Sequence, residues 1–245
     1  AADGSALHYK MILPDMEPGK RYPVFFEHYG GPSAQVVNRG WTGALAQAIA
    51  QRGFVYFELD NRGSAHRGVE FERQIYRAMG SVEVDDQLAG AAYLKSLPFV
   101  DAAKIATYGW SYGGYMTLKM LQAHPHVFAA GIAGAPVTKW GLYDTHYTER
   151  YLGDPGKEPQ VYAKADVLGA ADKIRDPLLL IHGMADDNVV FENSSALIAK
   201  MQNEAKPFEM MLYPGHTHRV GGPKVSVHMW NTIFAFLARH GVTPP

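Results

Sequence analysis

Residues 109–113 read Gly-Trp-Ser-Tyr-Gly and join a predicted strand to a predicted helix. β-Branched and aromatic residues precede this motif at positions 105–108, and an apolar, helix-favouring stretch follows it at 115–121. A serine at the apex of such a turn is held in a strained conformation, so its flanking residues must be small to let strand and helix pass closely. An ordinary strand-to-helix turn is the alternative. The strand and helix context favours a nucleophilic Ser111.

Strand-like and helix-like segments alternate along the rest of the chain. The expected strands are residues 22–29, 54–59, 105–108, 129–135, 177–181 and 208–213, and the expected helices are residues 41–52, 81–97, 115–121, 192–203 and 224–239. Near-continuous apolar strands separated by helical spans predict an α/β fold, in which helices cover both faces of a mostly parallel sheet. The aromatic-rich segment 137–171 breaks the alternation and predicts a short excursion above the sheet. We expect residues 1–245 to form a single domain.

Composition excludes several classes of protein. The net charge is −1, from 23 basic and 24 acidic residues, which is unlike the basic footprint of a nucleic-acid-binding protein. No apolar stretch approaches the roughly 20 residues needed to span a bilayer, and no signal peptide is present. Cysteine is absent, so disulfides and thiol nucleophiles are excluded, while the compartment stays open. The first residue is not methionine, which indicates a processed chain or a part of a longer one.

A serine hydroxyl becomes a good nucleophile when a histidine accepts its proton and a carboxylate orients that histidine. In α/β-hydrolases the acid and then the histidine follow the serine along the chain. The acid should lie in the turn after a late strand, where Asp186 and Asp187 are adjacent. Position alone gives a modest preference for Asp186. Asp187 would then bond backbone donors of the loop.

The histidine should lie between the last strand and the last helix. His216 and His218 both occur there, and at least one of them must be an ordinary solvated loop histidine. We expect one of the two to meet Ser111 and the other to face solvent. His182 ends a predicted strand before the acid loop and receives no role.

Metal and cofactor sites are not indicated. His216 and His218 could chelate zinc in principle, but no His-Glu-x-x-His or comparable cluster accompanies them. Residues 109–114 are not followed by the Gly-Lys-Ser/Thr of a phosphate-binding loop. We expect no metal and no cofactor.

Four separated motifs resemble the prolyl oligopeptidase family, and within it the dipeptidyl peptidase IV branch. They are Gly-Trp-Ser-Tyr-Gly-Gly-Tyr at 109–115, Ala-Pro-Val-Thr-Lys-Trp at 135–140 with the tyrosine-rich segment 143–151, His-Gly-Met-Ala-Asp-Asp-Asn at 182–188, and Tyr-Pro-Gly-x-x-His at 213–218. The resemblance covers nearly the whole chain, with the motifs in the family's order.

This resemblance implies roles for individual residues. Asp186 would be the acid and His218 the base. Tyr29, in a Tyr-Gly-Gly-Pro loop, would donate its hydroxyl to the oxyanion, and the backbone N–H of Tyr112 would be the second donor. Asn188 would hold a substrate carbonyl. A pocket for a proline-sized side chain would be formed by Tyr112, Val137, Trp140, Tyr143, Tyr147 and Val189.

The aromatic character of this pocket agrees with its implied ligand. The proline ring is apolar and has no N–H, so aromatic walls suit it. Packing of the excursion against the sheet is the alternative explanation for the same aromatic residues.

The chain departs from the family in two respects. Arg219 follows the implied base, where relatives often have glycine. The N-terminal β-propeller of full-length relatives, which carries the glutamates that bind the substrate amine, is not part of this chain. The resemblance therefore implies a homodimer or association with a separate propeller as a partner, and it favours a periplasmic or secreted location.

The sequence leaves three functions open. The leading hypothesis is a serine peptidase that cleaves peptides after proline or alanine near the N-terminus, through an acyl-enzyme. A carboxylesterase of short acyl esters on the same scaffold is the second. The third is a non-catalytic binding domain, which a broken triad would mark.

Overall fold

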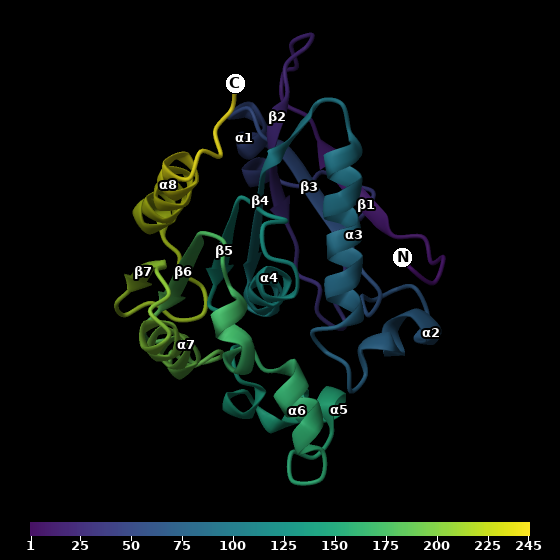
Figure 1. The fold of residues 1–245 in the computed structure, drawn as a ribbon, viewed down its shortest axis with the longest axis vertical. Coiled ribbons are helices and arrows are strands. Elements are labelled where there is room, and N and C mark those ends of the chain that lie inside the picture. Colours follow the sequence, from purple (N-terminus) through teal and green to yellow (C-terminus); the bar gives the residue numbers. More distant parts are fainter.

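A computed structural model describes residues 1–245 as seven strands in one sheet, in the order β1-β3-β2-β4-β5-β6-β7 (Figure 1). Strands β2 to β7 pair in parallel, and β1 pairs antiparallel with β3 at one edge. The strands are β1 His8–Ile12, β2 Tyr22–Glu27, β3 Val55–Asp60, β4 Val100–Trp110, β5 Ala130–Gly134, β6 Leu178–Gly183 and β7 Glu209–Tyr213. The predicted α/β class with a mostly parallel sheet is confirmed.

Helices lie on both faces of this sheet. They are α1 Ala44–Gln51, α2 Val69–Glu72, η1 Arg73–Ile75, α3 Val82–Ser96, α4 Tyr112–Ala123, η2 Trp140–Leu142, α5 Thr145–Leu152, α6 Pro159–Ala165, η3 Leu168–Lys173, α7 Glu192–Asn203 and α8 Pro223–Arg239. Two buried apolar clusters fill the layers between sheet and helices. Neighbouring residues of β2 point into different clusters: Phe25 belongs to the one that contains residues of α1 and α8, and Phe26 to the one that contains residues of α3, α4 and α7.

Strand β1 is an element that the sequence analysis missed. Its residues His8–Ile12 are exposed or half-buried, so no apolar run marks it, and it owes its conformation to pairing with β3 at the sheet edge. The helix predicted at 41–52 is also shorter than expected. It begins at Ala44 because Gly43 has a φ of 104°, which a helix cannot continue, and Trp41 is left 74% exposed.

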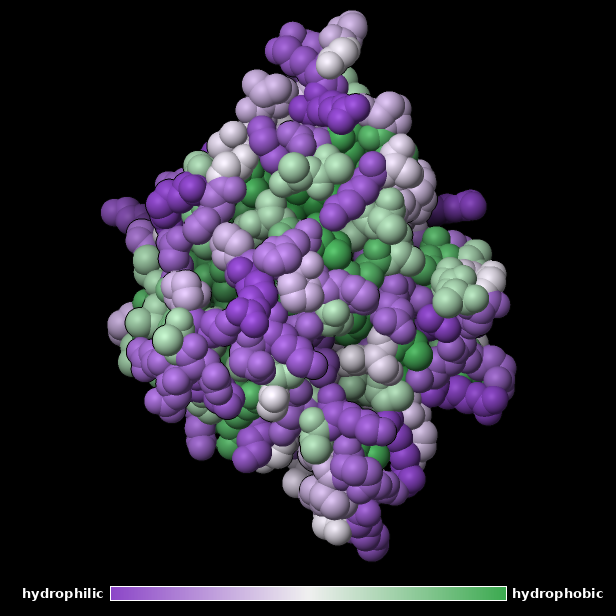
Figure 2. Space-filling view, in the orientation of Figure 1, coloured by the Kyte–Doolittle hydropathy of each residue, from purple (hydrophilic) through white to green (hydrophobic).

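The excursion predicted at 137–171 is present, and it contains η2, α5, α6 and part of η3. In Figure 1 α5 and α6 lie at the end of the molecule opposite the C-terminus. No helix is both long and apolar enough to cross a membrane. Figure 2 shows a mainly hydrophilic face with apolar residues gathered in small groups.

Two carboxyl groups share one tyrosine hydroxyl beside the sheet. The hydroxyl of Tyr56 lies 2.9 Å from Oε2 of Glu27 and 2.6 Å from Oε1 of Glu58. A phenol has one hydrogen, so it cannot serve two carboxylates at once. Burial raises the pKa of Glu27 from 4.5 to about 7, although the bond from Tyr56 acts in the opposite direction. Burial also raises the pKa of Glu58.

We therefore expect a pH-dependent contribution of Glu27 to stability. Because its pKa is raised in the folded state, its stabilising contribution is complete below pH 4.5 and is lost as the pH rises through about 7. Within that window the loss approaches about 1.4 kcal/mol per pH unit. Glu27→Gln cannot ionise, so urea unfolding of this variant should depend less on pH between 5 and 8. Glu149→Gln, at an exposed position, is the control, and equal pH dependence in wild type and Glu27→Gln would contradict the expectation.

Candidate active site

Ser111 lies between the end of β4 and the start of α4, with φ 62° and ψ −119°. Its N–H donates to the carbonyl of Gly134 at 2.8 Å, which fixes the turn to strand β5. A Cβ at Gly109 would lie 2.3 Å from the carbonyl oxygen of Gly113, and one at Gly113 would lie 2.5 Å from that of His28. Neither contact is sterically possible. The chain therefore needs glycine on both sides of a backbone strained at the serine.

Asp186 and His218 form a hydrogen-bonded pair. Nδ1 of His218 donates to Oδ2 of Asp186 at 2.7 Å. The Asp186 side chain is fully buried, whereas that of His218 keeps 19% of its surface exposed. The other carboxylate oxygen, Oδ1, accepts the backbone N–H groups of Asn188 and Val189, each at 3.0 Å. The neighbouring Asp187 is exposed. The two adjacent aspartates thus have opposite environments.

The two loop histidines also face different surroundings. His216 packs the edge of its ring against Tyr213, at 6.0 Å between centroids. Its carbonyl accepts the N–H of Ala185 at 3.0 Å, so the backbone of this loop is held against the acid loop. Only His218 of the pair contacts Asp186. Arg219, the departure noted in the sequence, is exposed.

A hydrogen bond joins the loop of His218 to the serine turn. The indole Nε1 of Trp110, the residue before Ser111, donates to the carbonyl of His218 at 2.9 Å. No direct hydrogen bond links Ser111 to His218 in this structure. In enzymes without bound substrate, catalytic hydrogen bonds are often long or poorly aligned and tighten in the substrate complex.

Tyr29 follows β2, and its ring lies 5.9 Å from that of Tyr112, the residue after Ser111. Burial raises the pKa of Tyr29, the charge of Tyr143 raises it further, and the nearby Ser111 side chain lowers it. The net effect is a phenol that stays protonated at neutral pH. It can therefore donate a hydrogen bond toward the serine.

Tyr112 begins helix α4, so its backbone N–H has no partner within the helix. Its ring is buried, and its hydroxyl donates to Oε1 of Glu83 at 2.8 Å. Glu83 is itself fully buried and accepts the N–H groups of Gly80 and Ser81, which precede α3. Burial raises the pKa of Glu83. The sequence analysis missed Glu83, which fixes the tyrosine ring next to the serine.

Aromatic rings from the excursion gather beside Tyr112. The ring of Trp140 lies 5.7 Å from that of Tyr112, 6.0 Å from that of Tyr143 and 6.1 Å from that of Tyr147. Val137 and Val189 are buried at 2% and 0% exposure. The structure thus brings together the aromatic residues that the resemblance grouped as a pocket. Burial raises the pKa of Tyr147 and keeps its hydroxyl protonated.

Asn188 is oriented by this aromatic group. The hydroxyl of Tyr143 donates to Oδ1 of Asn188 at 2.9 Å. Because its oxygen is occupied, the amide presents its two N–H donors elsewhere. Asn188 is exposed, so these donors are accessible to a ligand.

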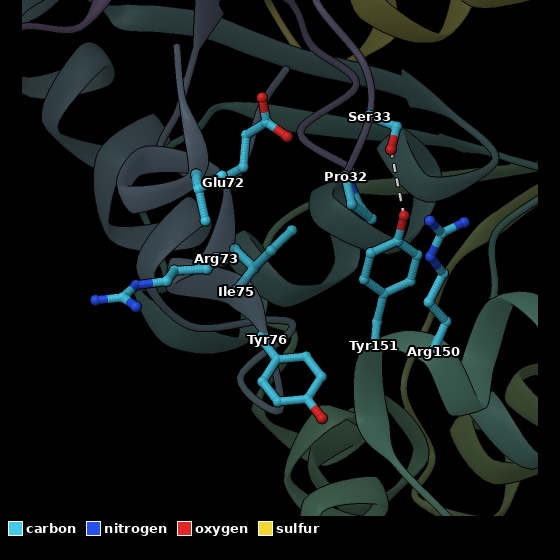
Figure 3. A pocket seen from close by; sticks show the side chains of 10 residues that line it. Pro32, Ser33, Glu72, Arg73, Ile75, Tyr76, Arg150 and Tyr151 are labelled. Atoms are coloured by element: carbon cyan, nitrogen blue, oxygen red, sulfur yellow. Dashed lines mark hydrogen bonds between the residues drawn. The ribbon is translucent and has the colours of Figure 1, made fainter. Parts of the chain in front are cut away.

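A cavity of about 420 Å³ adjoins this group on the side of the Tyr29 loop (Figure 3). Its lining comes from the Tyr29 loop, from α2 and η1 and from the end of α5: Pro32, Ser33, Gly63, Val69, Glu72, Arg73, Ile75, Tyr76, Arg150 and Tyr151. The hydroxyls of Ser33 and Tyr151 lie 3.2 Å apart across it, as the dashed line in Figure 3 shows. The Tyr151 ring also packs on that of Tyr147 at 4.9 Å. The cavity therefore adjoins the aromatic group at Tyr151.

His182 is a second residue that the sequence analysis left without a role. It ends β6, its side chain is fully buried, and its ring contacts Asp186. It is the first residue of the motif at 182–188, but the motif gave it no role, because its second partner, Ser194, lies in helix α7.

The sheet with its strained serine turn between β4 and α4 defines an α/β-hydrolase. Comparison with known proteins narrows this class. Residues 41–242 match the prolyl oligopeptidase family, and the chain belongs to that family.

Several curated relatives are peptidases. Mouse dipeptidyl peptidase 8 is 41% identical over 233 residues, covering 92% of this chain and 26% of the relative. Pig dipeptidyl peptidase 4 is 36% identical over 239 residues, covering 96% of this chain and 31% of the relative. Mouse prolyl endopeptidase FAP is likewise 36% identical and is covered to 31%. The chain thus spans between a quarter and a third of these relatives.

A solved structure shows a similarity of the same extent. The crystal structure of Porphyromonas gingivalis dipeptidyl peptidase 4 superposes with a TM-score of 0.92 at 35% identity. The match covers 95% of this chain and 33% of that structure. The similarity therefore extends through nearly every element of the fold described here.

Proposed function

We propose that this chain is the catalytic domain of a serine peptidase of the dipeptidyl peptidase type, cleaving after proline or alanine near the N-terminus of peptides. The observation that carries the proposal is the hydrogen-bonded pair of His218 and Asp186, tied through Trp110 to the strained turn of Ser111. The family and the names of the relatives support it.

In this proposal Ser111, Asp186 and His218 form the triad. The Oγ of Ser111 attacks the carbonyl carbon of the scissile bond while Nε2 of His218 accepts the hydroxyl proton. Asp186 accepts the N–H at Nδ1, which fixes the tautomer that leaves Nε2 free as a base. The carboxylate also stabilises the positive charge on the ring after the transfer.

The attack places a negative charge on the former carbonyl oxygen. The hydroxyl of Tyr29 and the N–H of Tyr112 are the proposed donors to it. Tyr29 is kept protonated by burial, and the N–H of Tyr112 is unpaired at the start of α4. Donors fixed before the reaction stabilise the transition state without reorganising during it.

Collapse of this intermediate breaks the C–N bond, and Nε2 of His218 returns its proton to the leaving amine. An ester between the acyl group and Ser111 remains. His218 then removes a proton from a water molecule that attacks the ester, and the serine regains its hydrogen as the acid product leaves. No metal or cofactor enters these steps.

The aromatic group beside Tyr112 is the proposed pocket for the residue before the cleaved bond. Trp140 and Tyr147 are nearly parallel, at 14°, and Tyr143 stands edge-on to both. Such walls suit a flat apolar ring. The free N–H donors of Asn188 would hold a carbonyl of the same substrate.

Binding of the substrate's amino end is the least constrained part of the proposal. The relatives are three to four times longer than the part that aligns with this chain. We propose that a propeller domain or a second copy of the chain supplies this part of the site. The peptide substrate is the other proposed partner.

The nucleophile is tested by covalent labelling. A fluorophosphonate should modify Ser111 and abolish hydrolysis of a glycyl-proline p-nitroanilide, whereas Ser111→Ala should be neither labelled nor active beyond a small residue. Intact-protein mass spectrometry and absorbance measure the two effects, with the exposed Ser96→Ala as control. Labelling of Ser111→Ala at the wild-type rate would refute the assignment. Turnover of p-nitrophenyl esters without any peptide cleavage would instead indicate a carboxylesterase.

The two loop histidines provide a matched pair. His218→Ala should lower kcat by about four orders of magnitude, because the proton acceptor is lost. His216→Ala should change kcat by less than about threefold, since this ring packs against Tyr213 and does not touch Asp186. Steady-state kinetics on both variants decides the matter, and the reverse ranking would make His216 the base.

Tyr29→Phe removes one hydroxyl and keeps the ring that packs on Tyr112. If this hydroxyl is an oxyanion donor, kcat should fall about 10²- to 10³-fold while KM changes little. Tyr9→Phe removes an exposed hydroxyl on β1 and is the control. A kcat within about threefold of wild type would mean that the hydroxyl supplies under ~1 kcal/mol, and backbone amides at Gly30 or Gly31 would replace it.

A further inference from the structure

The ring of His182 is fully buried between the acid loop and helix α7. Its Nε2 lies 3.1 Å from Oδ2 of Asp186 and 2.9 Å from the carbonyl oxygen of Val189. Its Nδ1 lies 2.6 Å from the hydroxyl of Ser194. Both side chains that it meets, Asp186 and Ser194, are themselves buried. The histidine thus occupies a closed polar site directly behind the acid.

These contacts determine where the ring carries its hydrogen. A carboxylate and a carbonyl are both acceptors, so Nε2 must be the donor. Burial is the main influence on the ring and lowers the pKa of His182, which leaves it neutral at neutral pH. Nδ1 then has only a lone pair, and the hydroxyl of Ser194 donates to it. The hydrogen bonds therefore run in one direction, from Ser194 to His182 to Asp186.

The consequence for Asp186 is that Oδ2 accepts two imidazole N–H groups. Nδ1 of His218 approaches it at 2.7 Å and Nε2 of His182 at 3.1 Å. With the two backbone donors on Oδ1, the carboxylate has donors on both oxygens. Its orientation is then fixed, and the negative charge on Oδ2 is shared between two hydrogen bonds.

We propose that His182 is a positioning residue that holds Oδ2 of Asp186 toward His218 and limits how strongly that oxygen retains a charged His218. This inference rests on the roles of Asp186 and His218 in the proposed function. His182 exchanges no proton during turnover. Through Asp186 it affects both how readily His218 takes up a proton and how readily His218 returns that proton to the leaving group.

The first test removes the donor. His182→Leu has a similar volume and cannot donate, so Oδ2 should attract the charged form of His218 more strongly. The acidic limb of kcat/KM against pH should move to higher pH by on the order of one unit. At neutral pH kcat/KM should fall about 10- to 100-fold, because the acid is also less well oriented. The rate of fluorophosphonate labelling against pH gives the same limb without relying on one substrate.

Two further variants distinguish the effect of the N–H donor at Nε2 of His182 from the effect of the ring's shape. His182→Gln can place an amide N–H near the position of Nε2 and should restore most of the wild-type limb. His182→Asn ends nearer the position of Nδ1, so it can meet Ser194 but not Asp186, and should behave like His182→Leu. It also replaces the leucine variant if that one does not fold.

Thr107→Val is the matched control. It removes the hydroxyl partner of another buried histidine of the same sheet, His28, whose Nε2 lies 2.8 Å from the threonine oxygen. This variant should lose stability in thermal unfolding without moving the acidic limb.

Two results would overturn the inference: a folded variant without the donor whose limb and kcat/KM match wild type, or equal losses in His182→Gln and His182→Leu. If the proposed function itself is wrong, the experiments would give a different result. In that case His218→Ala would remain active, or Ser111 would not be labelled, in a protein with the native His182.

Discussion

The close passage of strand β4 and helix α4 is the constraint on which the site depends. Helix α4 passes so close to β4 that no Cβ fits at Gly109, and so close to the end of β2 that none fits at Gly113. Ser111, between β4 and α4, takes a backbone conformation that few side chains adopt. Tertiary packing must compensate for this strain. Nearly all of α4 is buried, as are residues 105–109 at the end of β4, and Gly134 in β5 accepts the N–H of Ser111 itself. The central sheet thereby stabilises a turn that would be unfavourable in isolation.

The carboxyl groups near this turn are buried, and the hydrogen bonds that each one accepts determine its role. The side chain of Asp186 is fully buried and accepts hydrogen bonds on both oxygens, so its burial leaves neither oxygen unpaired. Glu83 is equally buried, but its role is structural. It anchors the hydroxyl of Tyr112 and the start of α3, so it joins the core of the domain to the wall of the aromatic group.

Most structural features that the sequence predicted correctly are marked by local patterns of residues. The serine turn was recognised because its strand, glycines and helix are contiguous, and the parallel sheet because its apolar runs are buried on both faces. Strand β1 was missed because an edge strand exposed to solvent has no such run. The roles of His182 and Glu83 were missed for another reason. Their partners, Ser194 and Tyr112, lie on other elements, and no spacing rule connects them.

The loop that carries His218 is attached to its surroundings at several points. Tyr213 and His216 accept backbone N–H groups of the acid loop, and the carbonyl of His218 accepts the indole of Trp110. These hydrogen bonds attach residues 213–218 to both the acid loop and the serine turn. Between Arg219 and the start of α8 lie the buried Val220 and the exposed Gly221 and Gly222. We expect a change in loop length to be tolerated better at the exposed Gly221 and Gly222 than within residues 213–218, whose backbone is hydrogen-bonded to the acid loop and to Trp110.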